Sequence, residues 1–173
     1  MVKTNGKPTQ PDDLDDDLFE DEDTQKDKYL TFHLANEDFG IDICFVTEII
    51  GIQAITPIPE MPDYIKGVIN LRGKVVPVMD VRTRFKLPFK EYDERTCIIV
   101  VDINETAVGL VVDEVREVMD IPESQIEPPP KTKGKNGSNF IKSIGKVEND
   151  VKIILNVSQL LYEEELEKLE KAA

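Results

Sequence analysis

The sequence contains an internal repeat, and this feature constrains the fold more than any other. Residues 29–52 align with residues 98–121 at an offset of 69, and apolar positions of one copy fall on apolar positions of the other. Further along the chain the offset becomes 76, and residues 75–81 align with residues 151–157. Few aligned pairs are identical, so a chance likeness between two alternating, β-rich segments is an alternative. Two long blocks that hold their register favour a duplication.

Each copy has the pattern of short β-strands joined by turns. In Tyr29–Leu34 the apolar side chains alternate with Thr31 and His33, which places these two residues on the opposite face of a strand. Turn residues recur about every 8–12 positions, and Gly73, next to Arg72 in a tight turn, suits a positive φ angle. A unit of this size is marginal alone. We therefore expect two small barrels that close their sheet edges and pack together.

The repeat divides the chain into an all-β body and two flanking segments. We predict a first barrel over residues 28–94 and a second over 95–160, with a flexible loop at 128–139 that absorbs the change of offset. Residues 1–27 are rich in Asp and Glu and are predicted to be a disordered tail. Residues 161–173 have the apolar spacing of a short helix. The sequence does not fix which barrel contains the first and last strands.

The charge and the cysteine content exclude several classes of protein. The chain has 21 Lys and Arg against 35 Asp and Glu, a formal net charge of −14. We therefore expect no binding to nucleic acid and no direct binding to an anionic membrane, because both require clustered basic residues. No apolar run approaches the roughly 18 residues of a spanning helix, and the first residues lack the apolar region of a secretory signal. Two cysteines form no disulfide framework, so a cytoplasmic protein is expected.

Few residues are candidates for catalysis or for binding a metal or cofactor. His33 has no partner that the sequence identifies, and we interpret it as an ordinary surface residue of a strand. Cys44 and Cys97 lack metal-ligand spacing and are predicted to be buried thiols. The acidic run 12–17 lacks the Gly and Glu of a calcium loop, and residues 134–138 lack the spacing of a phosphate loop. We predict no catalytic, metal-binding or cofactor-binding residues.

Several separated motifs resemble those of one family. The central motif is Asn70–Arg82, and the segments that match in the same order and spacing are Phe39–Ile43, Val46–Ile49, Tyr64–Val68 and Val108–Asp113. Together they are similar to the signature of the CheW family of bacterial chemotaxis coupling proteins. The resemblance covers about residues 28–162.

This resemblance implies both a fold and a function. Members of the family consist of two SH3-like five-stranded β-barrels packed together, which agrees with the repeat, and here a short C-terminal helix follows. They are adaptors without catalysis and join the cytoplasmic tip of methyl-accepting chemotaxis receptors to the regulatory domain of the histidine kinase CheA, at the inner face of the membrane. By resemblance we expect the same partners here. The alternative is a CheW-like module that binds a different peptide or helical partner outside chemotaxis, and self-association is left open.

The resemblance also implies a set of partner-binding residues. They lie at positions that the family uses in receptor or kinase contact, and in this sequence they are Val46, Glu48, Gly67, Arg72, Val115 and Val118. A sheet face with alternate exposed residues can hold a helical receptor segment, but the valines are equally compatible with a core. Arg72 can present its guanidinium to a carboxylate or a backbone carbonyl, or simply be solvated in its turn. Its aligned residue in the second copy is Glu148, so an Arg contact is not duplicated.

Overall fold

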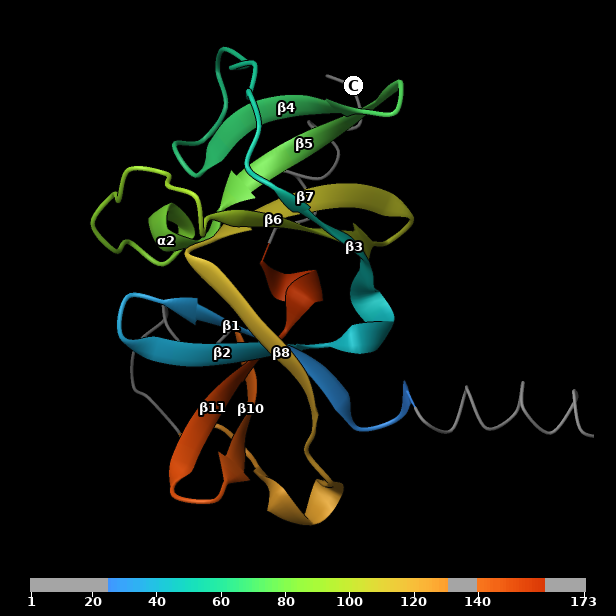
Figure 1. Cartoon of the computed structure of the whole chain (residues 1–173), viewed down its shortest axis with the longest axis vertical. Helices are drawn as coiled ribbons and strands as arrows, with labels where there is room; N and C mark the ends of the chain where they lie inside the picture. The colour runs from blue at the N-terminus through green and yellow to red at the C-terminus, as the bar shows by residue number, and fades with distance from the viewer. Residues whose placement is uncertain (1–24, 131–139, 161–173) are drawn as a thin grey trace, which may run out of the picture.

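β-Strands dominate the computed structural model, which describes residues 25–130 and 140–160 (Figure 1). In chain order the elements are β1 (Lys28–Leu34), β2 (Glu37–Asp42), η1 (Ile43–Phe45), β3 (Val46–Gly51), β4 (Ile65–Leu71), β5 (Lys74–Asp80), α2 (Val81–Arg84), β6 (Cys97–Ile103), β7 (Thr106–Val112), β8 (Glu114–Asp120), η2 (Glu123–Gln125), β9 (Ile126–Glu127), β10 (Ile141–Val147), β11 (Asp150–Leu155) and η3 (Val157–Gln159). Most of the predicted tail, the predicted helix 161–173 and residues 131–139 of the predicted loop lie outside the described residues.

The strands recur at the two offsets found in the sequence. β6 begins and ends 69 residues after β1, and β10 begins and ends 76 residues after β4. β2 and β7, β3 and β8, and β5 and β11 correspond in the same way, to within one or two residues at their ends. The alternation in β1 is also as expected, because Leu30, Phe32 and Leu34 are buried on one face. Each copy of the repeat therefore supplies five strands in the same order.

Each sheet takes strands from both copies of the repeat. One sheet has six strands in the order β8-β1-β2-β11-β10-β9, and the other has five in the order β3-β6-β7-β5-β4. β3 of the first copy pairs with β6 of the second, and β8 of the second copy pairs with β1 of the first. The sheets thus do not coincide with the predicted segments 28–94 and 95–160. The first and last strands, β1 and β11, belong to the same sheet, the lower one in Figure 1.

The connections before β3 and β8 explain this exchange. The 3-10 turn η1 joins β2 to β3, and the single residue Asp113 joins β7 to β8. Neither connection is a hairpin turn of the kind that lets a strand fold back on its predecessor. The chain therefore continues onto the neighbouring sheet, and Figure 1 shows β8 crossing from one sheet to the other.

The exchange is symmetric between the two copies. Leu30 of β1 pairs with Val118 of β8, and at the aligned positions Ile99 of β6 pairs with Ile49 of β3. Both pairings contain a β-bulge at the same place, and the hairpins β4–β5 and β10–β11 share another. Duplication, rather than a chance likeness of pattern, explains why irregularities recur as well as strands.

The expected fold of two small SH3-like barrels fits this all-β architecture, with two differences. The two-residue strand β9 gives one sheet six strands, whereas a single bridge between Thr56 and Val68 occupies the corresponding place in the other. Within the described residues, the order of hydrogen-bonded strands also ends at β8 and β9 in one sheet and at β3 and β4 in the other. Backbone pairing therefore does not close the barrels as expected, and β3 and β8 are edge strands.

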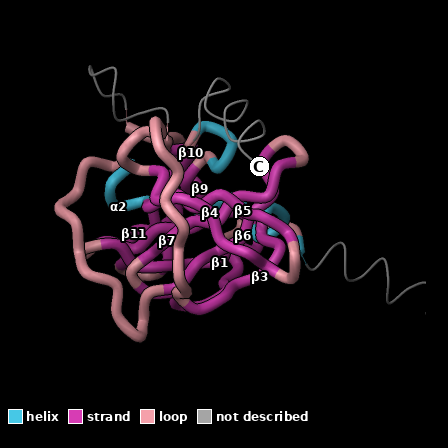
Figure 2. The backbone as a smooth tube through the Cα atoms, turned by 90° about the horizontal axis from the view of Figure 1, so that it is seen from above, coloured by secondary structure: helices cyan, strands magenta, loops and turns pink. Residues whose placement is uncertain are grey.

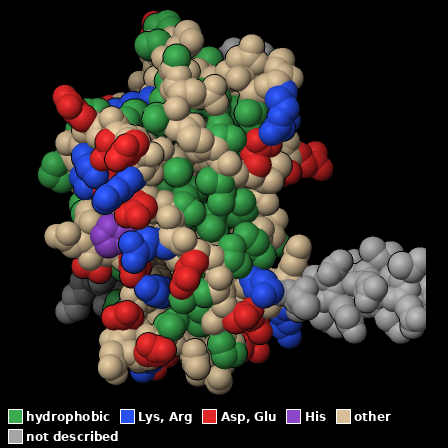
Figure 3. Space-filling view, viewed as in Figure 1, with side chains coloured by type: hydrophobic (Ala, Val, Ile, Leu, Met, Phe, Trp, Pro, Cys, Tyr) green, Lys and Arg blue, Asp and Glu red, His purple; other side chains and the backbone are tan. Residues whose placement is uncertain are grey.

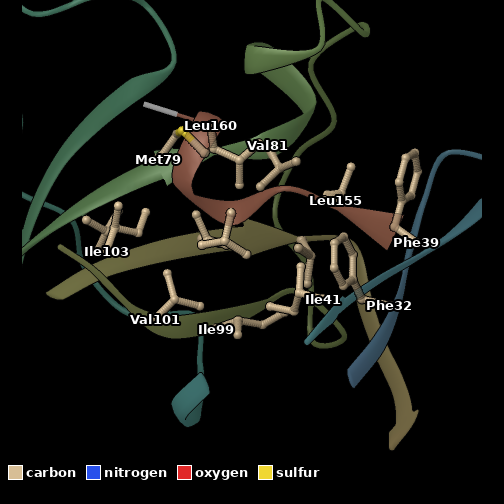
Figure 4. Packing of buried hydrophobic residues seen from close by; sticks show 14 of the residues in the cluster. Phe32, Phe39, Ile41, Met79, Val81, Ile99, Val101, Ile103, Leu155 and Leu160 are labelled. Atoms are coloured by element: carbon tan, nitrogen blue, oxygen red, sulfur yellow. The ribbon is translucent and has the colours of Figure 1, made fainter. Parts of the chain in front are cut away.

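One hydrophobic core joins the two sheets. Phe32 and Ile41 from the six-stranded sheet pack in the same cluster as Ile99 and Val101 from the five-stranded sheet (Figure 4). A smaller cluster lies in each sheet, and Figure 2 shows the strands of both sheets in the middle of the molecule. Burial of one such side chain stabilises the fold by about 1.5–3 kcal/mol. The predicted sharing of apolar surface between the barrels is thus present.

The prediction of two buried thiols is wrong. Cys44 is exposed and Cys97 is partly exposed. Cys44 lies in η1, where the chain passes between the sheets, and Cys97 is the first residue of β6. The apolar runs around these residues indicate strands, but the crossing leaves Cys44 exposed, and Cys97 at the end of its strand is only partly covered by the core.

Candidate functional site

Two of the predicted partner-binding residues contact each other. Arg72 and Gly73 form the turn between β4 and β5 with φ angles of 52° and 83°, as the turn of a two-residue hairpin requires. The Arg72 guanidinium reaches edge strand β3, where it donates hydrogen bonds to both carboxylate oxygens of Glu48, at 3.0 and 2.5 Å. The Arg72 side chain is 75% exposed and that of Glu48 is 22% exposed. The pair therefore joins β3 to the end of the β4–β5 hairpin and leaves the arginine accessible.

The three predicted valines differ in exposure. Val46 and Val115 are only partly exposed, and both pack against the shared core. Val118 on β8 is 50% exposed. The sequence left open whether these valines belong to an exposed face or to the core. Val118 presents apolar surface to solvent, whereas Val46 and Val115 contribute largely to packing.

Gly67 is buried in β4, and its backbone conformation explains why glycine stands there. Its φ angle is 142°, and a Cβ atom at this position would overlap the carbonyl group of Thr56. Backbone hydrogen bonds in both directions between Thr56 and Val68, each 2.9 Å long, hold the segment around Thr56 in this place. Gly67 thus allows a close backbone approach and does not itself offer a side chain to a partner.

Other exposed hydrophobic residues accompany Val118. Among the described residues, the most exposed large hydrophobic side chains are Ile49, Val75, Phe89, Val118 and Val151. Four of them form two pairs related by the repeat, since Ile49 aligns with Val118 and Val75 aligns with Val151. Figure 3 shows hydrophobic side chains in a band across the face on which β3 and β8 lie. Of these residues only Val118 was predicted, and the repeat offset relates Ile49 to it.

We name two surfaces from these residues. The β3 surface consists of Ile49 and Val75 with the Glu48–Arg72 pair. The β8 surface consists of the aligned residues Val118 and Val151. Each sheet thus carries exposed apolar residues at equivalent positions, one on the edge strand β3 or β8 and one in the β4–β5 or β10–β11 hairpin.

A partly buried ion pair connects the two sheets. Arg82 in α2 donates hydrogen bonds to Asp113, with its Nε at 2.7 and 3.0 Å and its Nη2 at 2.9 Å from the carboxylate oxygens. The same carboxylate accepts the N–H of Ala35, in the turn between β1 and β2, at 3.0 Å. Burial alone would raise the pKa of Asp113, but these hydrogen bonds outweigh it and hold the pKa below its ordinary value. Asp113 therefore links the β7–β8 crossing to both sheets.

A second contact between the sheets is aromatic. The Arg84 guanidinium lies 4.4 Å from the ring centre of Tyr64 and 4.6 Å from that of Phe140, a stacking that favours arginine. The two rings belong to aligned positions of the repeat. Arg84 also donates a 2.7 Å hydrogen bond from Nε to the carbonyl of Leu160. This arrangement joins the entries to β4 and β10, which lie in different sheets.

His33 has partners that the sequence did not reveal. Its Nδ1 lies 2.8 Å from one carboxylate oxygen of Asp38, and Lys152 donates to the other oxygen at 2.6 Å. Asp38 is in β2 and Lys152 is in the neighbouring strand β11. This polar cluster ties neighbouring strands of one sheet and contains no nucleophile.

Asp38 gives the fold a predicted dependence on acid pH. The hydrogen bonds from Lys152 and with His33 hold the pKa of Asp38 below its ordinary value of 3.8. A carboxyl group with a lowered folded-state pKa stabilises the fold above the unfolded pKa, and the contribution is lost as the pH falls through the folded pKa. In urea unfolding from about pH 5 to pH 2, we expect the free energy of unfolding to fall less in Asp38→Asn than in the unchanged protein. Equal slopes for the two proteins would contradict this role.

The described residues contain no cluster of His, Cys, Asp or Glu with the geometry of a metal site. Among them there is also no helix that is long and apolar enough to span a membrane.

Comparisons with known proteins agree on one family. The model of the CheW-like domain matches residues 28–165. Chemotaxis protein CheW of Klebsiella aerogenes is 37% identical over 146 residues, which cover 84% of this chain and 88% of that protein. Chemotaxis protein CheW of Bacillus subtilis is 36% identical over 138 residues, covering 80% of this chain and 88% of that protein.

A solved structure shows the same fold. The scaffolding protein TtCheW of Thermoanaerobacter tengcongensis superposes with a TM-score of 0.75 at 38% sequence identity. The match covers 80% of this chain and 94% of that chain. The similarity thus extends over nearly the whole of the related structure.

Proposed function

The chain belongs to the CheW-like family of non-catalytic chemotaxis scaffold proteins, and from this premise we propose that it couples methyl-accepting chemoreceptors to the histidine kinase CheA. One part of its surface contacts the cytoplasmic tip of the receptors, and another contacts the regulatory domain of the kinase. The protein acts in the cytoplasm, at receptor arrays on the inner face of the membrane.

The observation that carries this proposal is the pair of repeat-related surfaces on β3 and β8. A scaffold must hold two partners at once, so it needs two accessible surfaces rather than one pocket. Edge strands with exposed apolar residues suit this task, because exposed apolar patches mark interaction sites. The two hairpins beside these surfaces also differ in charge, since the β4–β5 turn has Arg72 where the β10–β11 turn has Glu148. This difference supports binding of unlike partners.

The predicted residues take different roles in this proposal. Arg72 and Val118 contact partners directly, because both are largely exposed on these surfaces. Glu48 orients the Arg72 guanidinium through the two hydrogen bonds between them. Val46 and Val115 support the edge strands from the core side.

The proposal is tested by titration calorimetry against the isolated regulatory domain of a chemotaxis histidine kinase from the same source. We expect saturable one-to-one binding, with an affinity in about the micromolar range. A titration against receptor-tip protein then shows whether both partners bind together. No heat from a folded sample, confirmed by a pull-down, would remove the kinase role. Sedimentation of the protein alone shows whether a second copy competes for the same surface.

Arg72→Ala should separate binding from folding. The ion pair with Glu48 is largely exposed, and such pairs contribute about 0–1 kcal/mol to stability. We expect a near-normal urea midpoint but kinase-domain or receptor-tip binding weakened about tenfold, since arginines at interfaces often contribute more than about 1 kcal/mol. Arg95→Ala, at an exposed arginine away from both surfaces, is the control and should bind normally. An unfolded Arg72→Ala protein, or one that binds both partners normally, would contradict the role.

A further inference from the structure

The β-bulge between β1 and β8 contains an unusual hydrogen-bonding arrangement at Thr31. Two residues of β8, Arg116 and Glu117, lie opposite this single residue of β1. The Thr31 hydroxyl donates to the carbonyl of Glu117 at 2.8 Å and accepts the N–H of the same residue at 3.2 Å. Thr31 is only 2% exposed although it lies on the face away from the core. One buried hydroxyl thus satisfies both backbone groups of an edge-strand residue.

The aligned place in the other sheet is built differently. The residue aligned with Thr31 is Val100 of β6, which has no hydroxyl and pairs in register with Glu48 of β3. In the described pairing of β1 with β8, Thr31 and Glu117 have no such registered pair. The side chain of Thr31 therefore holds the backbone of β8 at a position where β3 and β6 instead pair in register.

The contacts outside the strand also differ between the two edges. The Glu48 side chain holds β3 to the β4–β5 turn through Arg72. In the second copy the aligned residues are Glu117 and Glu148, which carry like charges and cannot form an ion pair. The edge strand β8 is thus held at the backbone of Glu117, whereas β3 is held at the side chain of Glu48.

We infer that Thr31 is a positioning residue for the β8 surface, because its hydroxyl holds the backbone of Glu117, the residue next to Val118. The inference deepens the proposed function, on which it rests, by stating which interaction holds each of the two surfaces in place. The exposed Glu48–Arg72 pair is screened by salt, because interactions between exposed charges weaken as ionic strength rises. The hydrogen bonds of the Thr31 hydroxyl are not screened in this way, because the hydroxyl is buried and uncharged. Salt therefore weakens the Glu48–Arg72 contact of the β3 surface and the exposed Lys28–Asp120 pair at the end of β8, but not the hydrogen bonds at Glu117.

The test that needs no partner is amide hydrogen exchange. Thr31→Val keeps the shape of the side chain and removes the hydroxyl, and Thr31→Ser restores it. We expect exchange at the Glu117 amide, which donates to the Thr31 hydroxyl, to accelerate at least tenfold in Thr31→Val and to stay near normal in Thr31→Ser. Thr96→Val is the matched control, since Thr96 is also buried but its hydroxyl bonds only to Asp93. Thr96→Val should leave the amide exchange rates of β8 unchanged.

Three results would overturn the inference. They are unchanged exchange of β8 in Thr31→Val, failure of Thr31→Ser to restore it, and equal acceleration in β4 and β5, which would indicate a general loss of stability. The unchanged protein gives a further test. Raising sodium chloride from low to high concentration should leave exchange at the Glu117 amide unchanged, because its acceptor is the uncharged Thr31 hydroxyl. Acceleration at Glu117 as large as that in β3 would count against the inference.

The titration against the kinase regulatory domain separates this inference from the proposed function. If the unchanged protein does not bind, the proposed function fails, but the exchange results still decide whether Thr31 positions β8. If Val118→Glu abolishes binding, the partner uses the β8 surface. Thr31→Val should then weaken binding several-fold, Thr31→Ser should restore it, and normal binding by Thr31→Val would overturn the positioning role.

Discussion

Replacement of Asp113 by asparagine is expected to lower the free energy of unfolding by about 3–5 kcal/mol, because it leaves a buried arginine without its counter-charge. The Arg82 and Asp113 side chains are only 14% and 12% exposed. Asparagine can accept fewer of the hydrogen bonds that the carboxylate accepts from Arg82 and from the N–H of Ala35. Because Asp113 is the only residue between β7 and β8, its loss loosens the crossing between the sheets.

Urea unfolding measures this effect. The control is Asp120→Asn, since Asp120 forms an exposed ion pair with Lys28 between β8 and β1, and such pairs contribute about 0–1 kcal/mol. If Asp113→Asn proves too unstable to purify, Arg82→Lys, which keeps the charge but loses the forked geometry, should lie between the two. Equal midpoints for Asp113→Asn and Asp120→Asn would show that the ion pair does not hold the sheets together.

Much of the local structure followed from the sequence, because local structure depends on local chemistry. Alternating apolar residues and turn residues indicate strands wherever one face is buried, and Gly73 was identified at its turn for this reason. Which sheet a strand joins depends on contacts far along the chain. The single residue Asp113 and the turn η1 direct β8 and β3 across to the other sheet, and no hydrophobic pattern encodes that choice.

For the candidate site, the sequence identified individual residues but not the contacts between them. Resemblance supplied Glu48 and Arg72, but their mutual contact joins residues 24 apart and required the fold. The burial of Gly67 depends on the segment around Thr56, which has no pattern that places it there. The repeat relates Ile49 to Val118 and Val75 to Val151, but the exposure of Ile49 and Val118 follows from the position of β3 and β8 at sheet edges.

Gly67→Ala should destabilise the fold by about 2–5 kcal/mol, since a strained φ angle costs about 1–3 kcal/mol and overpacking costs a similar amount. The new Cβ would overlap the carbonyl group of Thr56, which is fixed by two backbone hydrogen bonds to Val68. The aligned residue in the second copy is Ser143, at the equivalent bulge. A side chain is thus tolerated there but not at Gly67. Gly51→Ala is the control, because its Cβ meets open space, and its stability should change by no more than about 0.5 kcal/mol.

Any loss of binding in Gly67→Ala then has a structural origin. Gly67 is buried and has no side chain, so it offers a partner no side-chain contact. We expect weak apparent binding at temperatures where the variant is partly unfolded and near-normal affinity where unfolding curves show it fully folded. A variant with the stability of the unchanged protein and no affinity for the kinase regulatory domain would instead place Gly67 at the interface. Stability and affinity measured on the same samples therefore distinguish a residue that shapes the binding surface from one that touches the partner.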